Sequence, residues 1–290
     1  MSIDSVALGI GVLGAVLNLG LGLVTLSRKR GGVDWGLMLA IAALDSLCSL
    51  FFGLRVVVKW VDEQSVSNGF WCGVGSLAMA AGLLMALFLA SMLSLVRYLV
   101  IVRNSEINHG LFYTCVSLVC VFVGGLHIVR GATVDVIVYP SGLLCATQFW
   151  GYDFASQFFG ISNISIYVLS LLLIVVCYSL LSHRYYSVMR ACNYTGCRLY
   201  VPVAGLVLVS ILYLVAMLPE AIVFFLLHDP LSRRTWVMDA ITILPVAAIP
   251  TINALHTLAL HEDTRKHIIN SIRISTETSN PYYCYTVESY

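Results

Sequence analysis

The chain has 290 residues, of which 59% are hydrophobic and 11% are charged, and its formal net charge is +1 at pH 7. A soluble domain of ordinary composition carries about 25% charged residues, so most of this surface is expected to contact lipid rather than water. The near-neutral charge gives no basis for binding nucleic acid or acidic substrates. The composition therefore predicts an integral membrane protein whose immediate partner is membrane lipid.

Seven segments are apolar and long enough to cross a hydrocarbon core of about 30 Å, which requires roughly 20 residues per helix. Backbone amides inside a bilayer need internal partners, so each segment is expected to be a helix. The first segment is expected to stay as a membrane anchor rather than to be cleaved as a signal peptide. The predicted fold is an all-α bundle of seven transmembrane helices, forming one domain over residues 1–273. The segments lie at 5–27, 35–58, 71–101, 110–129, 154–182, 200–227 and 235–259.

The distribution of arginine and lysine predicts the orientation, because basic residues are enriched in cytoplasmic loops. With the amino terminus outside, the inner loops and tail hold Arg28, Lys29, Arg30, Arg97, Arg103, Arg184, Arg190, Arg198, Arg265, Lys266 and Arg273. The outer side holds only Arg55, Lys59, Arg130, Arg233 and Arg234. We therefore expect a multi-pass plasma-membrane protein with an extracellular amino terminus and a cytoplasmic carboxyl tail.

The nine cysteines give an independent check of this topology. Only Cys72 and Cys145 reach the outer side, where disulfides persist, whereas the others lie in helices or face the reducing cytosol. One disulfide is therefore expected between the outer end of the third segment and the loop that follows the fourth. In that loop, residues 133–139 alternate in hydrophobicity before the turn residues at 140–142, so residues 133–150 predict a β-hairpin that Cys145 pins over the bundle.

The chain after the seventh segment divides into two parts. Residues 261–273 alternate charged residues with isoleucine, which predicts a short amphipathic helix lying on the membrane. Residues 274–290 are expected to form a disordered cytoplasmic tail.

Polar residues inside membrane helices are costly, so each of them marks a candidate functional position. They include Asn18, Asp45, Arg97 with Tyr98, Tyr178 and Asn253, and prolines interrupt the sixth and seventh segments, in Met217-Leu218-Pro219 and at Pro250. Their order and spacing, together with the two outer cysteines, resembles the rhodopsin-like (class A) family of G-protein-coupled receptors across nearly the whole chain. The chain looks like a divergent member of that family.

This resemblance implies a receptor rather than an enzyme, with an extracellular ligand bound within the bundle and a heterotrimeric G protein activated at the inner ends of helices 3, 5, 6 and 7. Asn18 and Asp45 are expected to form an internal polar network, in which Asp45 is satisfied by Asn18, by water or by Asn253. Asp45 resembles the family's sodium-binding residue, but Ala86 and Ile249 replace two of its companions, so too few oxygens remain and neither a metal nor a cofactor is expected. Coupling and activation would fall to Arg97, Tyr98, Tyr178, Pro219, Pro250 and Asn253.

The acidic residue that normally precedes the helix 3 arginine of the family is Val96 here. Arg97 therefore lacks its usual neighbouring restraint, which predicts some basal activity. The alternative interpretation is that Arg97 only extends its charge to the membrane interface, as basic residues at helix ends do.

The outer half of the bundle contains residues at positions that line the family's ligand pocket: Arg55, Met79, Asn163, Met217, Glu220 and Asp239. Met79 stands where amine receptors carry an aspartate, so the ligand is not expected to be a typical amine. Arg55 and Asp239 could instead pair with each other across the bundle. Retinal is not expected, because its Schiff base needs a lysine in helix 7, and the lysines are Lys29, Lys59 and Lys266.

Three other functions compete with this interpretation. A small seven-helix transporter remains the alternative, although the inverted repeats common in transporters are not visible in the sequence. A receptor-like fold that no longer couples to G proteins also remains open. A seven-helix zinc hydrolase would need histidines at one depth, whereas His127 and His256 are predicted at opposite faces of the membrane.

Overall fold

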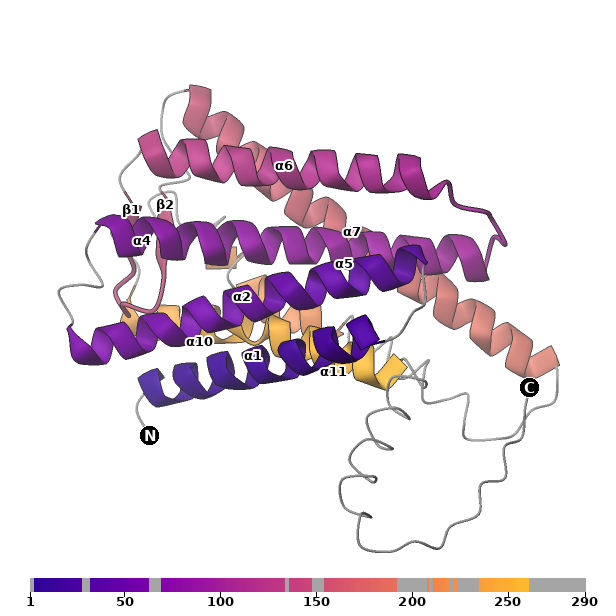
Figure 1. Ribbon diagram of the computed structural model, residues 1–290, viewed down its shortest axis with the longest axis horizontal. Helices are drawn as coiled ribbons and strands as arrows, with labels where there is room; N and C mark the ends of the chain where they lie inside the picture. Colours follow the sequence, from indigo (N-terminus) through magenta and orange to yellow (C-terminus); the bar gives the residue numbers. More distant parts are fainter. Residues whose placement is uncertain are drawn as a thin grey trace, which may run out of the picture.

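The computed structural model describes residues 3–27, 32–62, 69–133, 136–147, 154–191, 208, 211–219, 222–223 and 235–260. Within these ranges six helices are long and apolar enough to cross a membrane, and they lie alongside one another in one elongated bundle (Figure 1). Of the predicted span 200–227, residues 211–219 are described as helical. The predicted amphipathic helix at 261–273 and the tail at 274–290 lie outside the described residues.

The first two spans, α1 (Ile3–Ser27) and α2 (Val33–Val61), pack along each other over their length. Small residues allow this close approach: a Cβ added at Gly11 would lie 2.9 Å from the backbone nitrogen of Gly53. Glycine-lined contacts of this kind are typical of helix pairs in membranes, where association depends on close packing.

The third span is one continuous helical rod with a π-helical turn in it. It consists of α4 (Gly69–Ser76), the π turn at Leu77–Ala81 and α5 (Gly82–Ile101). The π turn contains Met79, which the sequence placed in the ligand pocket. Single π turns inside α-helices are frequently found at functional sites.

The fourth and fifth spans are α6 (His109–Thr133) and α7 (Phe154–Ala191). The sequence predicted that the fifth span ends at 182. That prediction was wrong, because residues 183–191 continue the helix, and the sequence offers neither glycine nor proline there to end it. The far end of α7 projects beyond the other labelled helices (Figure 1).

The last span divides into α10 (Trp236–Ala247) and α11 (Ile249–Leu260), where the sequence predicted one helix over 235–259. Pro250 causes the division, because proline has no N–H to donate to the carbonyl of Val246 four residues earlier. The start of α10 is capped by Thr235, whose hydroxyl accepts a hydrogen bond from the backbone N–H of Met238 at 3.2 Å.

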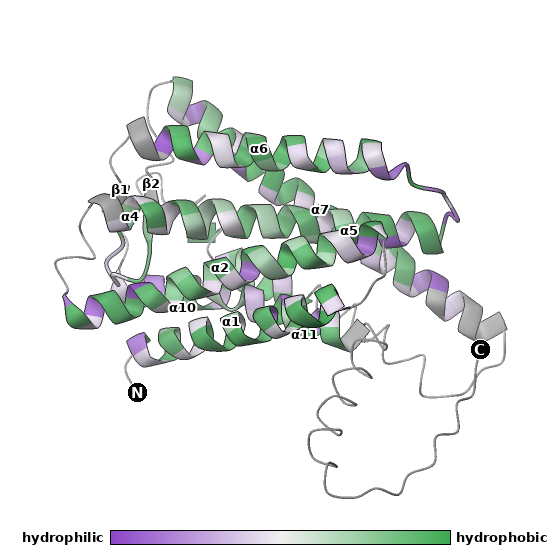
Figure 2. Ribbon diagram, in the orientation of Figure 1, coloured by the Kyte–Doolittle hydropathy of each residue, from purple (hydrophilic) through white to green (hydrophobic). Residues whose placement is uncertain are grey.

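The helices consist largely of hydrophobic residues, as the hydropathy colouring shows (Figure 2). Large apolar side chains are exposed on several helices, including Val16, Leu23, Val121, Ile128 and Leu169. Polar side chains such as Asn18, Asp45 and Asp239 are instead buried in the interior. A surface of this kind fits a lipid environment, so the chain is a multi-pass membrane protein.

The predicted β-hairpin is present between α6 and α7. Strand β1 (Val136–Val138) pairs antiparallel with β2 (Cys145–Thr147), with Val138 opposite Cys145. Gly142 has a φ of +71°, which glycine adopts without the steric cost that a side chain would bring. We call the end of the bundle that carries this hairpin the outer end, and the opposite end the inner end.

Candidate functional site

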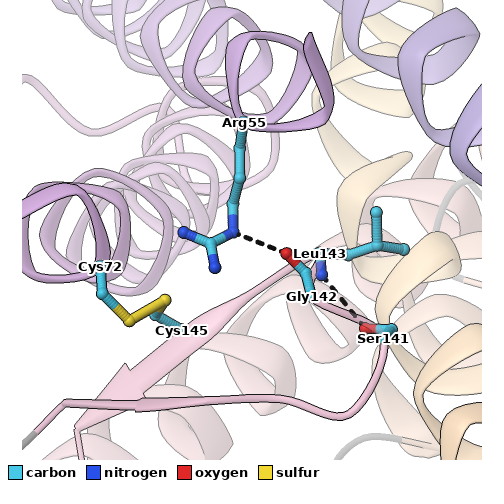
Figure 3. Close-up of a disulfide and its surroundings, with 6 residues drawn as sticks. All are labelled: Arg55, Cys72, Ser141, Gly142, Leu143 and Cys145. Carbon is cyan, nitrogen blue, oxygen red and sulfur yellow. Dashed lines mark hydrogen bonds between the residues drawn. A yellow bond between two sulfur atoms is a disulfide. The ribbon is translucent and has the colours of Figure 1, made fainter. Parts of the chain in front are cut away.

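At the outer end a disulfide holds the hairpin against the third span. Cys72 in α4 and Cys145 in β2 are bonded, with their Cα atoms 5.4 Å apart (Figure 3). This confirms the predicted pairing. The bond fixes the second strand and leaves the turn between the strands, residues 139–143, directed into the bundle.

The turn fills the space between the outer ends of the helices. Ser141 and Leu143 are buried, with exposed fractions of 2% and 0%. Tyr139 and Leu143 belong to one buried apolar cluster with residues of α1, α2, the third span and α10, whose members are Ala7, Cys48, Phe52, Val56, Met79, Leu83, Ile243 and Ala247. The cavity beside Arg55 has a volume of only about 20 Å³, whereas ligand pockets measure roughly 300–1,000 Å³.

Three charged side chains from the helices hold the backbone of this turn. Arg55 in α2 donates from Nε to the carbonyl of Gly142 at 3.0 Å (Figure 3). One helical turn further along α2, Lys59 donates to the carbonyl of Ser141 at 3.0 Å and forms an ion pair with Asp4 at 2.8 Å. From α10, the Asp239 carboxylate accepts the backbone N–H of Ser141 at 2.8 Å. Arg55 in α2 and Asp239 in α10 thus contact adjacent residues of the same turn from two different helices.

The other residues predicted for the ligand pocket lie elsewhere. Asn163 in α7 is hydrogen-bonded to His127 in α6, with 2.8 Å between Asn163 Oδ1 and His127 Nε2. Met217 belongs to a second apolar cluster in the middle of the bundle, and its carbonyl accepts the hydroxyl of Tyr167 at 3.1 Å. Glu220 lies outside the described residues. The structure therefore gathers Arg55, Met79 and Asp239 around the hairpin turn, and not the whole predicted set.

At the inner end Arg97 is buried, with an exposed fraction of 7%, and contacts two other helices. Its Nη1 donates to the hydroxyl of Tyr178 in α7 at 3.4 Å. Its Nε lies 3.5 Å from Oδ2 of Asp34, in the first turn of α2. The side chain of Asp34 is 41% exposed, so the ion pair lies at the edge of the protein interior. A carboxylate from α2 thus contacts Arg97, while Val96 beside it is buried among apolar residues.

Around Arg97, aromatic residues complete the inner end. The Tyr178 ring meets the ring of His256 in α11 edge to face, with centroids 5.5 Å apart. Tyr98 follows Arg97 in the last turns of α5 and is half-buried. A cavity of about 20 Å³ is lined in part by Tyr178, Tyr213, Asn253 and His256, which is room for about one water molecule.

A buried chain of hydrogen bonds joins three helical segments between the two ends. The Tyr213 hydroxyl donates to Oδ1 of Asn253 in α11, and Asn253 Nδ2 donates to Oδ2 of Asp45 in α2 at 2.7 Å. Asn18 in α1 was expected beside Asp45 but donates to the carbonyls of Gly14 and Pro250, at 2.9 Å and 2.8 Å. Among the described residues, Oδ1 of Asp45 and Oδ1 of Asn18 have no hydrogen-bond partner.

Sequence reasoning missed Asp34, Lys59 and Tyr213. One signal for Asp34 was available, because an acidic residue in the first turn of a helix that begins at the same face as Arg97 is a candidate partner. Lys59 stands one helical turn after Arg55, which puts both cations on one side of α2. Tyr213 offered no signal, since a tyrosine in an apolar helix carries no pattern of its own. In the described part of the chain, no three His, Cys, Asp or Glu residues are placed to hold a metal ion.

The described helices are arranged as in the rhodopsin fold. Among solved structures the chain is similar to squid rhodopsin, with a TM-score of 0.66 and 16% sequence identity, over 95% of this chain and 86% of that chain. At this level of identity the likeness shows the fold alone. No protein-family model matches the sequence, and no curated protein matches it.

Proposed function

We propose that this protein is a receptor of the G-protein-coupled type, which activates a heterotrimeric G protein through the inner ends of its helices. In this proposal the protein lies in the plasma membrane, with the amino terminus and the hairpin outside and the carboxyl tail in the cytosol. The rhodopsin-like fold supports the class of protein. The disulfide supports the orientation, because disulfides persist on the extracellular side.

The observation that carries the proposal is the position of Arg97 between Asp34 and Tyr178. A guanidinium is always charged and offers five donors in a planar fork, so it can hold the backbone carbonyls of a docked peptide. Asp34 restrains it from α2, and Tyr178 offers a second partner on α7. Losing the contact with Asp34 would free the guanidinium for a docked peptide, and an external ligand would act by favouring that state over the state with the ion pair.

The link between the two ends is the chain formed by Tyr213, Asn253 and Asp45. It joins residue 213, in the predicted sixth span, to α11 and α2, and α2 also carries Asp34 at its start and Arg55 near its outer end. Pro219 lies in the same predicted span and Pro250 at the break in the last, where missing backbone hydrogen bonds allow bending. In our proposal a change at the outer site alters how the predicted sixth span packs against α11, and thereby frees Arg97.

The test uses the ligand-free protein, because basal coupling needs no known ligand. The full chain would be co-expressed with each class of Gα subunit and a G-protein dissociation sensor, with Arg97→Ala as the matched variant at equal surface levels. We expect one Gα class to show basal dissociation that Arg97→Ala removes. If no Gα class responds to the protein, and Arg97→Ala abolishes the uptake of a solute instead, the transporter interpretation replaces this one.

A further inference from the structure

We propose that the outer site recognises a peptide turn, and that residues 139–143 of the hairpin are its built-in occupant. The proposal rests on the proposed receptor function, since it names the ligand class of that receptor. The external ligand is then a peptide that presents a tight turn between two apolar side chains and takes the place of the protein's own turn.

The first argument is the chemistry of the polar contacts. Arg55 and Lys59 place cationic donors on two successive carbonyls, and Asp239 places a carboxylate on a backbone N–H. All three contact the main chain, so each would be satisfied by the main chain of another peptide. Hydrogen bonds to charged groups are stronger than those between neutral groups, and three of them from two helices define the position of a turn.

The second argument is the pair of apolar anchors that flank these contacts. Tyr139 and Leu143 are 7% and 0% exposed, and they lie in one cluster with Phe52, Val56 and Met79. Buried aromatic and aliphatic anchors at the centre of a contact carry most of the binding energy in protein interfaces. The outer site thus has both features of a peptide-binding site, namely polar contacts to the main chain and apolar space for side chains.

The third argument is that the resident turn belongs to a small element with few constraints of its own. The sheet consists of two strands of three residues each, and an isolated two-stranded hairpin is marginally stable in water. The Cys72–Cys145 disulfide holds the hairpin close to the site, so the turn competes at a high effective concentration. An external peptide binds only the fraction of molecules whose site is open, which lowers its apparent affinity for the unaltered protein.

The experiment measures binding to the full chain in lipid nanodiscs without any G protein. The probe is a fluorescent cyclic peptide with the sequence of residues 138–144, compared with the same peptide N-methylated at its serine so that the N–H is lost. The receptor variant is Gly142→Val, because a β-branched residue is strained at the φ of +71° found there and so loosens the resident turn. Ser141→Pro is the second variant. It removes the N–H that donates a hydrogen bond to Asp239, and it does not place a side chain at the left-handed position of Gly142.

We expect the peptide to bind Gly142→Val or Ser141→Pro about ten-fold more tightly than it binds the unaltered protein. N-methylation should weaken binding to the loosened variant by about ten-fold, the usual effect of losing one hydrogen bond to a charged group. Adding Asp239→Ala to that variant should remove the difference between the two peptides, because their only difference is the bond to Asp239.

Two results would overturn the proposal. One is that neither loosened variant, once shown to be folded by size-exclusion chromatography and a cooperative thermal transition, binds the peptide. The other is that both peptides bind the loosened variant equally. Signalling takes no part in this measurement, so a failure of G-protein coupling leaves the binding result standing. If the protein couples to a G protein but does not bind the peptide, the proposed ligand class is wrong and the proposed receptor function stands.

Discussion

Arg97 near the inner end of α5 and Asp34 in the first turn of α2 form an ion pair, with 3.5 Å between Nε and Oδ2. The family that the sequence resembles places the acidic partner beside the arginine in the same helix, where this chain has Val96. Here the carboxylate comes from another helix, so the pair also holds α2 against α5. Breaking the Arg97–Asp34 ion pair therefore changes the packing of α2 against α5 and not only the rotamer of one side chain.

We predict that Asp34→Asn raises basal G-protein activation, because it removes the charge that restrains Arg97. The pair is partly exposed, and exposed pairs are worth up to about 1 kcal/mol, so the increase should be roughly two- to five-fold. The G-protein dissociation sensor measures it at equal surface levels. Glu106→Gln is the matched control, since Glu106 is an exposed carboxylate in the loop after α5. An equal rise in both variants would mean that general charge, and not this pair, is responsible.

Arg97→Ala is expected to reduce signalling at least ten-fold while leaving delivery to the cell surface nearly unchanged. The reason is that Arg97 lies at the inner end, far along the bundle from the hairpin site, and would contact the G protein itself. Tyr178→Phe should reduce signalling less, because it loses one long hydrogen bond to Arg97 and keeps the ring contact with His256. The G-protein dissociation sensor would measure the basal signalling of both variants in cells with matched receptor numbers. Normal signalling by Arg97→Ala would reject the coupling mechanism.

Restoring an acidic residue beside the arginine should fail in this protein. Val96 is 2% exposed in a cluster with Leu37, Ile41 and Val116. Val96→Asp therefore buries a carboxyl among apolar side chains and should destabilise the fold by about 3 kcal/mol. Thermal denaturation in detergent micelles would measure this, with Val96→Ala as the apolar control. If Val96→Asp is as stable as Val96→Ala and lowers basal activity, then a neighbouring acid can restrain Arg97 after all.

Asn253→Ala is predicted to lower the free energy of unfolding by about 1–3 kcal/mol, because it leaves a buried Asp45 oxygen and the Tyr213 hydroxyl without their partner. Ser46→Ala is the matched control: Ser46 is also buried, but its hydroxyl bonds only the Ala42 carbonyl of its own helix. Thermal midpoints of the two purified variants would be compared. Equal midpoints would show that the chain from Tyr213 to Asp45 adds no stability.

Cys72→Ser should lower stability by about 2–4 kcal/mol, because the bond closes a loop between positions 73 residues apart. Cys145→Ser and the double variant should lower it by the same amount, since each removes the same bond. Thermal denaturation with and without a reducing agent measures the effect, and the reducing agent should act only on the unaltered protein. A double variant that is clearly less stable than either single variant would show that the cysteines also stabilise the protein in another way.

Most of the fold could be predicted from the lengths of the apolar segments, because a helix needs roughly 20 apolar residues to cross a bilayer. The inner end of α7 did not follow as easily. Hydropathy marks where a helix leaves the membrane and not where its hydrogen bonding ends, so it does not show that residues 183–191 continue the helix. The hairpin was predictable because alternation, turn residues and a single eligible cysteine pointed to the same segment.

The candidate sites were predictable only in part. Arg55, Met79 and Asp239 do share one site, but the sequence could not show that the turn at Ser141 and Gly142 fills it. That contact joins residues far apart in the chain, and no pattern along the sequence records it. Asp34 was missed for the same reason, because its importance comes from the helix opposite and not from its own neighbours.

The length of α7 has a mechanical consequence. Its 38 residues contain no proline, so the helix can transmit a tilt as a stiff lever. Ala191 lies 21 residues beyond Ser170, which corresponds to about 32 Å along the axis. A tilt of about 5° around Ser170 would then displace the tip by about 3 Å. A small movement within the bilayer is thereby enlarged outside it, at the face where we expect the G protein to dock.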